Sequence, residues 1–179
     1  MWTSTDHKPS KEPFTPVVRP TAATAIVGQP LADYPTLFRV HRWQRRTVPC
    51  DHPTCLLCRE LLVVEHRIYL PILDYRTSSI ALLDLPETHW TTLKRFEIEN
   101  SGLRSCVLKS YRTRPQDNAP IALLARELKS SDQSYDRELD PVPIFTAITA
   151  SNKEKAVFDL LCGKSNAPES SRLNDRAPT

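Results

Sequence analysis

Three cysteines lie close together in the chain, at Cys50, Cys55 and Cys58, with His52 inside the run and His41 upstream of it. Thiolates and imidazoles are ligands that Zn²⁺ prefers in proteins, and three sulfurs with one ring nitrogen complete a tetrahedral site. With four protein ligands, no coordination position remains open for a water molecule. The spacing therefore predicts a zinc ion with a structural role.

Two histidines compete for the fourth ligand position. His52 lies only two residues after Cys50, so that sharing one tetrahedron with it strains a very short loop. His41 lies on the preceding predicted strand and can fold over the cysteines. His41 is favoured and His52 is the alternative, while a loop with free thiols and no metal also stays open. The other two cysteines, Cys106 and Cys162, are predicted to be small buried hydrophobic residues.

Enzyme motifs are missing from the sequence. The chain has only three glycines, which excludes glycine-rich phosphate-binding loops. A zinc-dependent base deaminase needs His-x-Glu ahead of Pro-Cys-x-x-Cys, and this pattern does not occur. Spacing alone leaves cysteine–histidine nucleophilic catalysis open. We nevertheless predict a protein that is not an enzyme, because each clustered thiol is explained as a metal ligand.

The composition fits a globular protein with a small excess of positive charge. Apolar residues make up 40% of the chain and the formal net charge is +3. No apolar run is long enough for a signal peptide or a membrane-spanning helix. Clustered cysteines without an export signal favour a metal site in a reducing compartment over a disulfide framework. The expected location is the cytoplasm, with no membrane partner.

Alternating apolar residues predict a mainly β fold. The expected strands cover 37–48 (as one strand or two short ones), 67–75, 80–85, 103–113 and 121–128, with a helix over 86–96. A small antiparallel barrel with a zinc knuckle, and with one helix between its third and fourth strands, is an OB-like fold. A small α+β sandwich with the same order of elements is the alternative.

The ends of the chain are predicted to lie outside this barrel. Residues 1–36 and 163–179 are polar or rich in proline and are expected to be disordered tails. Residues 37–128 form the zinc-stabilised OB-like domain. Residues 129–162 are expected to form an acidic linker and a short C-terminal helix over 151–162, preceded by a candidate strand over 141–150.

Cationic and aromatic residues are interleaved on the predicted strands, as proteins that bind single-stranded nucleic acid require. The candidates to neutralise phosphates are Arg39, Arg42, Arg45, Arg46, Arg112 and Arg114. The candidates to stack on bases are Trp43, Tyr69 and Tyr111. The alternative is that the arginines line solvated strand faces and that Trp43 lies in the core.

The motifs His41-x-Trp43, Pro49-Cys50-x4-Cys55-x2-Cys58, Arg67-Ile68-Tyr69 and Leu82 to Pro86 also support a resemblance. Across about residues 37–128 the chain resembles small zinc-knuckle OB-fold proteins of bacteria and their mobile elements, and is loosely similar to the zinc-containing single-stranded DNA-binding protein of T-even phages. The resemblance implies an OB-fold with structural zinc and single-strand binding.

Together these observations predict a zinc-stabilised protein that binds single-stranded nucleic acid with weak sequence selectivity, DNA being favoured over RNA. The alternative is a zinc-knuckle adaptor that docks onto another protein through its sheet edge and its C-terminal segment.

Overall fold

The computed structural model describes residues 17–44 and 46–162, and within them the fold is mainly β. Eight strands belong to one sheet: β1 (Val17–Val18), β2 (Ile26–Pro30), β3 (Leu37–Trp43), β4 (Arg46–Pro49), β5 (Val64–Asp74), β6 (Ser79–Pro86), β7 (Cys106–Arg112) and β8 (Ile121–Glu127). The helices are α1 (Leu56–Arg59), α2 (Trp90–Glu99) and α3 (Pro141–Leu161), with short 3-10 turns at Glu87–His89 and Leu103–Ser105.

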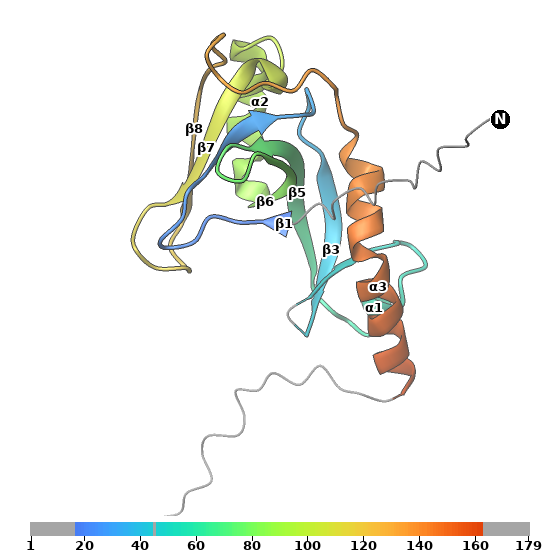
Figure 1. Cartoon of the computed structure of the whole chain (residues 1–179). Coiled ribbons are helices and arrows are strands. Elements are labelled where there is room, and N and C mark those ends of the chain that lie inside the picture. The colour runs from blue at the N-terminus through green and yellow to red at the C-terminus, as the bar shows by residue number, and fades with distance from the viewer. Residues whose placement is uncertain (1–16, 45, 163–179) are drawn as a thin grey trace, which may run out of the picture.

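The sheet is open and strongly curled (Figure 1). Its main path runs β1-β6-β5-β2-β7-β8, and β3 and β4 branch from β5. The described part of β8 pairs with β7 and with no other strand, so the closed barrel that the sequence predicts is not formed by these pairings. All neighbours are antiparallel except β1, which lies parallel to β6.

Strand β5 joins the two halves of the sheet. One of its edges pairs with β6 from Arg67 to Asp74. The other edge pairs first with β3 as far as Ile68 and then with β2 from Ile72 onward. Pro71 lies at this change of partner, where its missing N–H costs no ladder bond, and its carbonyl accepts from the Leu31 N–H at 2.8 Å. This explains how a proline fits inside an interior strand.

The predicted disordered tail over residues 1–36 is wrong for residues 17–36. They contain β1 and β2, and β2 lies inside the sheet between β5 and β7. The short run Ile26–Pro30 gave little pattern because Gly28 interrupts it. A Cβ at Gly28 would stand only 2.2 Å from the Leu73 carbonyl oxygen, so the close approach of β2 to β5 requires glycine. Residues 1–16 and 163–179 lie outside the described part.

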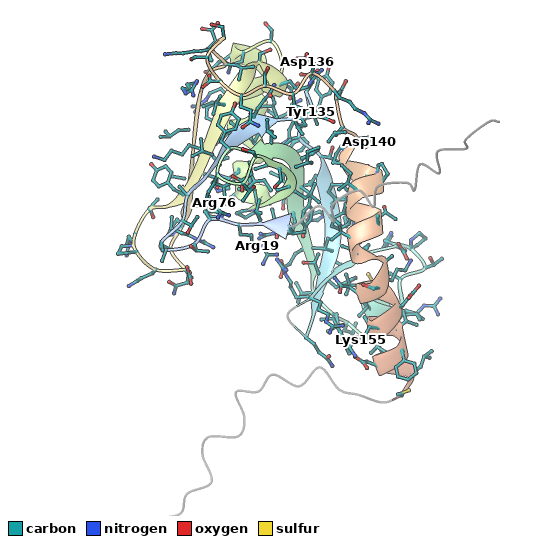
Figure 2. The ribbon with its side chains drawn as sticks, viewed as in Figure 1. Arg19, Arg76, Tyr135, Asp136, Asp140 and Lys155 are labelled. Atoms are coloured by element: carbon teal, nitrogen blue, oxygen red, sulfur yellow. The ribbon has the colours of Figure 1, made fainter. Side chains whose placement is uncertain are left out.

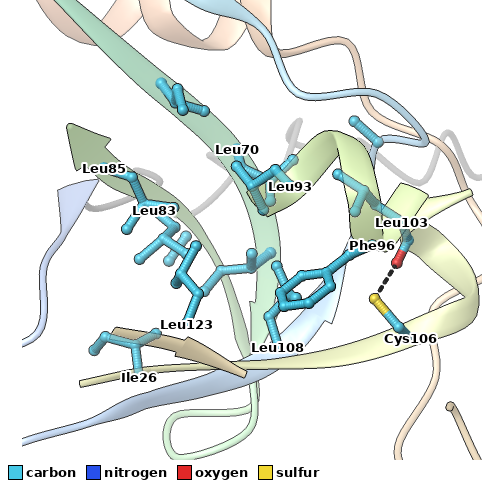
Figure 3. Close-up of a cluster of buried hydrophobic side chains, with 14 residues drawn as sticks. Ile26, Leu70, Leu83, Leu85, Leu93, Phe96, Leu103, Cys106, Leu108 and Leu123 are labelled. Atoms are coloured by element: carbon cyan, nitrogen blue, oxygen red, sulfur yellow. Dashed lines mark hydrogen bonds between the residues drawn. The ribbon is translucent and has the colours of Figure 1, made fainter. Parts of the chain in front are cut away.

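The main hydrophobic core fills the inside of the curl (Figure 3). Helix α2 contributes Leu93 and Phe96, which pack against buried side chains of β5 to β8. Cys106 is fully buried here, as predicted from its sequence context, and its Sγ donates to the Leu103 carbonyl at 3.0 Å. The core therefore fixes the positions of β5, β6 and β7, which bear the charged residues considered below.

Helix α3 is one long helix on the outer side of β3, and not a strand followed by a short helix (Figure 1). Asp140 caps it by accepting from the Val142 N–H at 2.9 Å, and Pro141 and Pro143 fall in the first turn, where backbone N–H groups have no helical partner. The candidate strand over 141–150 is therefore wrong, because prolines at these positions favour a helix start. The predicted start of the short helix, at Ser151, lies inside α3.

The first half of α3 packs on the outer face of the sheet. Phe145 is buried against Phe38 of β3 and Tyr69 of β5, with ring centroids 4.3 and 4.5 Å away. Ile144 and Ile148 extend this second core, which also holds Val40 and Leu82. The second half of the helix lies over β4 and the cysteine-rich loop.

Candidate metal centre and nucleic-acid interface

The four favoured ligands come together in one cluster. His41 extends from β3, Cys50 directly follows β4, and Cys55 and Cys58 lie at the start of α1 and within it. Their candidate ligand atoms all lie within 4.8 Å of one another. The hairpin of β3 and β4 and the loop after it thus converge on a single point.

The distances in the cluster fit a tetrahedron. The Sγ atoms of Cys50 and Cys58 are 3.4 Å apart, and His41 Nε2 lies 3.4 Å from Cys55 Sγ and 3.5 Å from Cys58 Sγ. A zinc tetrahedron with bonds of about 2.3 Å to sulfur and about 2.0 Å to nitrogen has edges of about 3.5–3.8 Å. These three separations are close to those that one small ion requires, and all four atoms lie within 4.8 Å of one another.

The second ring nitrogen of His41 fixes the orientation of the ring. Its Nδ1 lies 3.1 Å from the Val63 carbonyl oxygen, which can only accept, so Nδ1 carries the proton. Nε2 then directs its lone pair into the space between the three sulfurs. Metal-binding histidines usually donate their other ring N–H to a carbonyl or carboxylate in this way. The ring is completely buried, so no water competes for this position.

The pKa values of Cys55 and Cys58 are shifted in opposite directions. Burial acts to raise the pKa of Cys55, but hydrogen bonds from the backbone at Cys58, Asp51 and Leu57 outweigh it and lower that pKa. Burial, together with the neighbouring Cys50 and Cys55 thiols, raises the pKa of Cys58 to about 11. Three thiolates this close repel one another, so a bound cation is needed to hold all of them deprotonated.

His52, the alternative ligand, is exposed and is not part of the cluster. Cys162 is exposed near the end of α3, which corrects the expectation that it is buried. The geometry therefore supports the set of His41 and three cysteines. It shows a site compatible with a structural metal ion.

The cluster fastens several elements to one another. A small core lies beside it and includes Cys55 itself, with Cys50 and Cys58 packed at its border. Its other buried members are Trp43, Val48, Leu57 and Ala156. Helix α3 is also tied to this region by the Asn152 side chain, which donates to the Thr47 carbonyl at 3.1 Å, and by the Lys153–Asp51 ion pair. Because this core is small, a metal ion would contribute much of its stability.

The prediction that Trp43 and Tyr69 stack on bases is wrong, because both side chains are buried. Trp43 is 2% exposed and lies under Ala156 of α3, and Tyr69 is 1% exposed between Phe38 and Phe145. Neither ring offers a free face to a base. The sequence did not reveal this because the helix that covers both rings is about a hundred residues away. Tyr111 remains half-buried on β7, with Lys109 Nζ 5.6 Å from its ring centroid.

The predicted cationic residues divide into separate groups. Arg42 and Arg46 line a cleft beside α3, Arg112 lines a second cleft, and Arg39 and Arg114 are exposed elsewhere. Arg39 borders a third, apolar groove. Arg45 lies outside the described residues.

Two arginines and one carboxylate that the sequence analysis did not single out organise the surface between the clefts. Asp84 of β6 is completely buried, and its Oδ1 accepts from Arg67 Nε at 2.8 Å and pairs with Nη2 at 2.7 Å. Its Oδ2 is hydrogen-bonded by Arg19 and lies 3.9 Å from Arg42 Nη2. A buried aspartate in an apolar strand was the available signal, since such a charge requires partners.

The two clefts share Arg19, which follows β1 and lies between the β7–β8 hairpin and β3 (Figure 2). One cleft is lined by Arg19, Arg42 and Arg46, and the other by Arg19, Arg67 and Arg112. We call these five residues the arginine track. In the part of the chain that the structure describes, Asp84 contacts this track, and Glu65 lies 3.4 Å from Arg42 Nε.

Comparisons with known proteins found no match among family models, curated proteins or solved structures. No helix in the described residues is long and apolar enough to cross a membrane. The function is therefore argued from the site alone.

Proposed function

We propose that this protein is a zinc-stabilised, non-enzymatic domain that binds single-stranded nucleic acid along the arginine track, with weak sequence selectivity. The metal cluster holds the β3–β4 hairpin and α3 in place. The track then presents guanidinium groups from five different chain positions on one continuous surface.

The observation that carries the proposal is the track itself. Five arginines line two clefts that meet at Arg19, and among the described residues the carboxylates of Asp84 and Glu65 contact them. Phosphates along a strand are neutralised by such a series of cations, and release of their counterions supplies the affinity. Arginine suits this role because its planar group can bond a carboxylate and a phosphate with different edges.

The donor set supports zinc as the ion. Three sulfurs and one imidazole nitrogen are soft ligands with tetrahedral spacing, which excludes the oxygen-preferring cations Mg²⁺ and Ca²⁺. With four protein ligands the site would be closed, so its role would be to stabilise the fold. The predicted OB-like character stays part of this proposal and rests on the resemblance, because the described strands form an open sheet.

Burial of Trp43 and Tyr69 changes the expected balance of forces. With Tyr111 as the remaining predicted stacking residue, charge contributes more than stacking. We therefore expect a steep salt dependence and little preference among bases. Comparing oligothymidine with oligouridine tests whether DNA is favoured over RNA.

Fluorescence anisotropy of a labelled oligothymidine with the metal-loaded protein tests the proposal. Five displaced counterions give a slope of about −3.5 for log K against log salt concentration, from about 0.7 per contact on single strands. Arg46→Gln, in the track, lowers the slope by about 0.7. The matched control is Arg95→Gln, because Arg95 is exposed on α2 and away from the track. Absence of binding at low salt, or equal effects of both variants, contradicts the proposal.

A second candidate function, docking onto a protein, is favoured by the apolar groove beside α3. Its volume is about 970 Å³ and its walls include Leu37, Phe38, Phe145, Val157 and Phe158. The side chains of Phe158 and Leu161 are 60% and 78% exposed at its border. If the metal-loaded protein does not bind oligonucleotides, the adaptor function is the remaining hypothesis.

A further inference from the structure

The cleft lined by Arg19, Arg67 and Arg112 is smaller than a nucleotide-binding cavity. Its volume is about 260 Å³, and its remaining polar lining consists of Thr88, His89 and Asn118. Pro86, Pro120 and Ile121 close its sides with apolar atoms. A space of this size, lined by cations and by short hydrogen-bonding side chains, suits a compact anion.

Positive charges outnumber negative ones in the cleft. Three arginines line it, and Asp84, which contacts two of them, carries a single negative charge. The hydrogen bonds of Arg112 go to the neutral carbonyl oxygens of Pro20 and Ala119, at 3.0 and 2.6 Å. The cleft thus keeps a net of two positive charges. A phosphodiester carries one negative charge, whereas a phosphomonoester carries about 1.5 to 2 at neutral pH.

The cationic groups are held in position before any ligand binds. Arg67 is 16% exposed and fixed by two contacts to Asp84, and Arg112 is fixed by two backbone carbonyls. Each guanidinium has five N–H donors, so these contacts leave further donors for a ligand. Fixed donors avoid the ordering cost that flexible lysines would bring to phosphate binding.

The positive charge of the cleft also affects the pKa of His89. Burial and the nearby Arg67 lower the pKa of His89. At neutral pH its ring is therefore neutral and can donate one hydrogen bond to an anion. The Thr88 hydroxyl and the Asn118 amide offer further donors on the same wall.

We propose that this cleft is a phosphate-binding pocket that takes the terminal phosphomonoester of a strand. The assignment of the phosphate to a strand end rests on the proposed function, because the rest of the strand would continue from Arg19 toward Arg42 and Arg46 along the arginine track. Binding would then favour strands with a phosphorylated end over the same strands with hydroxyl ends.

The first test compares three internally labelled oligothymidines of equal length, with a 5′-phosphate, a 3′-phosphate or two hydroxyl ends. We expect one phosphorylated end to increase affinity about tenfold, the effect of one additional charge-assisted contact. Isothermal titration calorimetry with inorganic phosphate measures the pocket without a strand.

Two pairs of variants locate the effect. Thr88→Glu places a negative charge in the cleft, whereas Thr91→Glu places it three residues away at an exposed position outside the cleft. Arg112→Gln removes a cation of the cleft, and Arg114→Gln removes an exposed one nearby. Thr88→Glu and Arg112→Gln should abolish the preference for a phosphorylated end, and the two controls should keep it.

The outcomes separate this inference from the proposed function. Salt-dependent binding with equal affinity for all three ends overturns the phosphate pocket and leaves the proposed function intact. Inorganic phosphate binding that Thr88→Glu removes, without binding of any oligonucleotide, supports a pocket for free phosphate but overturns the strand-end assignment. If neither ligand binds, both proposals are wrong.

Discussion

Replacing Asp84 by Asn tests whether one buried carboxylate organises the arginine track. Asp84 is completely buried and contacts Arg67 and Arg19 directly, with Arg42 Nη2 at 3.9 Å. Asparagine keeps the size of the side chain and one acceptor oxygen, but it removes the negative charge. The variant therefore alters the electrostatics of the cluster with little change in packing.

The expected loss of stability follows from the exposure of the partners. Breaking a buried ion pair costs about 3–5 kcal/mol when the remaining charge stays buried. Here the side chains of Arg67, Arg42 and Arg19 are 16%, 29% and 41% exposed, so water can partly hydrate them. We therefore expect a decrease of about 2–3 kcal/mol in the free energy of unfolding. Affinity for a hydroxyl-ended strand should not fall, because the track gains net positive charge.

Urea denaturation of the metal-loaded protein, followed by tryptophan fluorescence, measures this loss. Asp132→Asn is the matched control, because Asp132 forms a bidentate pair with Arg126, at 2.6 and 2.7 Å, near the surface. Its loss should be smaller, since Arg126 remains hydrated after the exchange. If Asp84→Asn destabilises the protein no more than Asp132→Asn, Asp84 does not organise the track. A large loss of affinity in a folded Asp84→Asn protein contradicts the argument as well.

Three further predictions concern single side chains. Trp43→Ala should decrease the free energy of unfolding by about 3–5 kcal/mol, because it empties a buried site beside the metal cluster. The folded fraction of this variant should bind oligothymidine normally. A selective loss of binding would show that Trp43 stacks on bases. Because the pKa of His89 is lowered in the folded protein, the unfolded chain takes up a proton first as the pH falls. The contribution of His89 to stability is therefore complete above about pH 6.5 and is lost as the pH falls through its folded pKa. His89→Gln should flatten this part of the profile of stability against pH, and an unchanged profile would contradict the lowered pKa. Iodoacetamide at pH 8 should modify the exposed Cys162 and spare Cys106, because burial raises the pKa of Cys106 to about 11. Mass spectrometry of the folded protein measures both modifications, and faster modification of Cys106 than of Cys162 would contradict the prediction.

The sequence was most informative where function depends on neighbours in the chain. Three of the four ligands lie within nine residues, so their spacing alone indicated a common site, and His41 was favoured by its place on the preceding strand. The apolar runs at 67–75 and 80–85 likewise predicted two neighbouring strands, which pair as β5 and β6.

Contacts between distant segments were not predictable in this way. Arg19 and Asp84 are 65 residues apart, and Arg19 lies in a segment that was taken for a disordered tail. Whether Trp43 is exposed depended on α3, whose first half was predicted as a candidate strand. Local pattern thus predicted the metal cluster, while long-range pairing determined which residues line the arginine track.

Metal content, measured together with thermal unfolding, tests most directly whether an ion holds this fold together. Protein purified under reducing conditions should contain about one zinc ion per chain. Removal of the ion by a chelator, or the exchange Cys58→Ser, should lower the unfolding temperature markedly, and added zinc should restore only the wild-type protein. A metal-free protein that unfolds at the same temperature, with Cys50, Cys55 and Cys58 all free to react with a thiol reagent, would contradict the account.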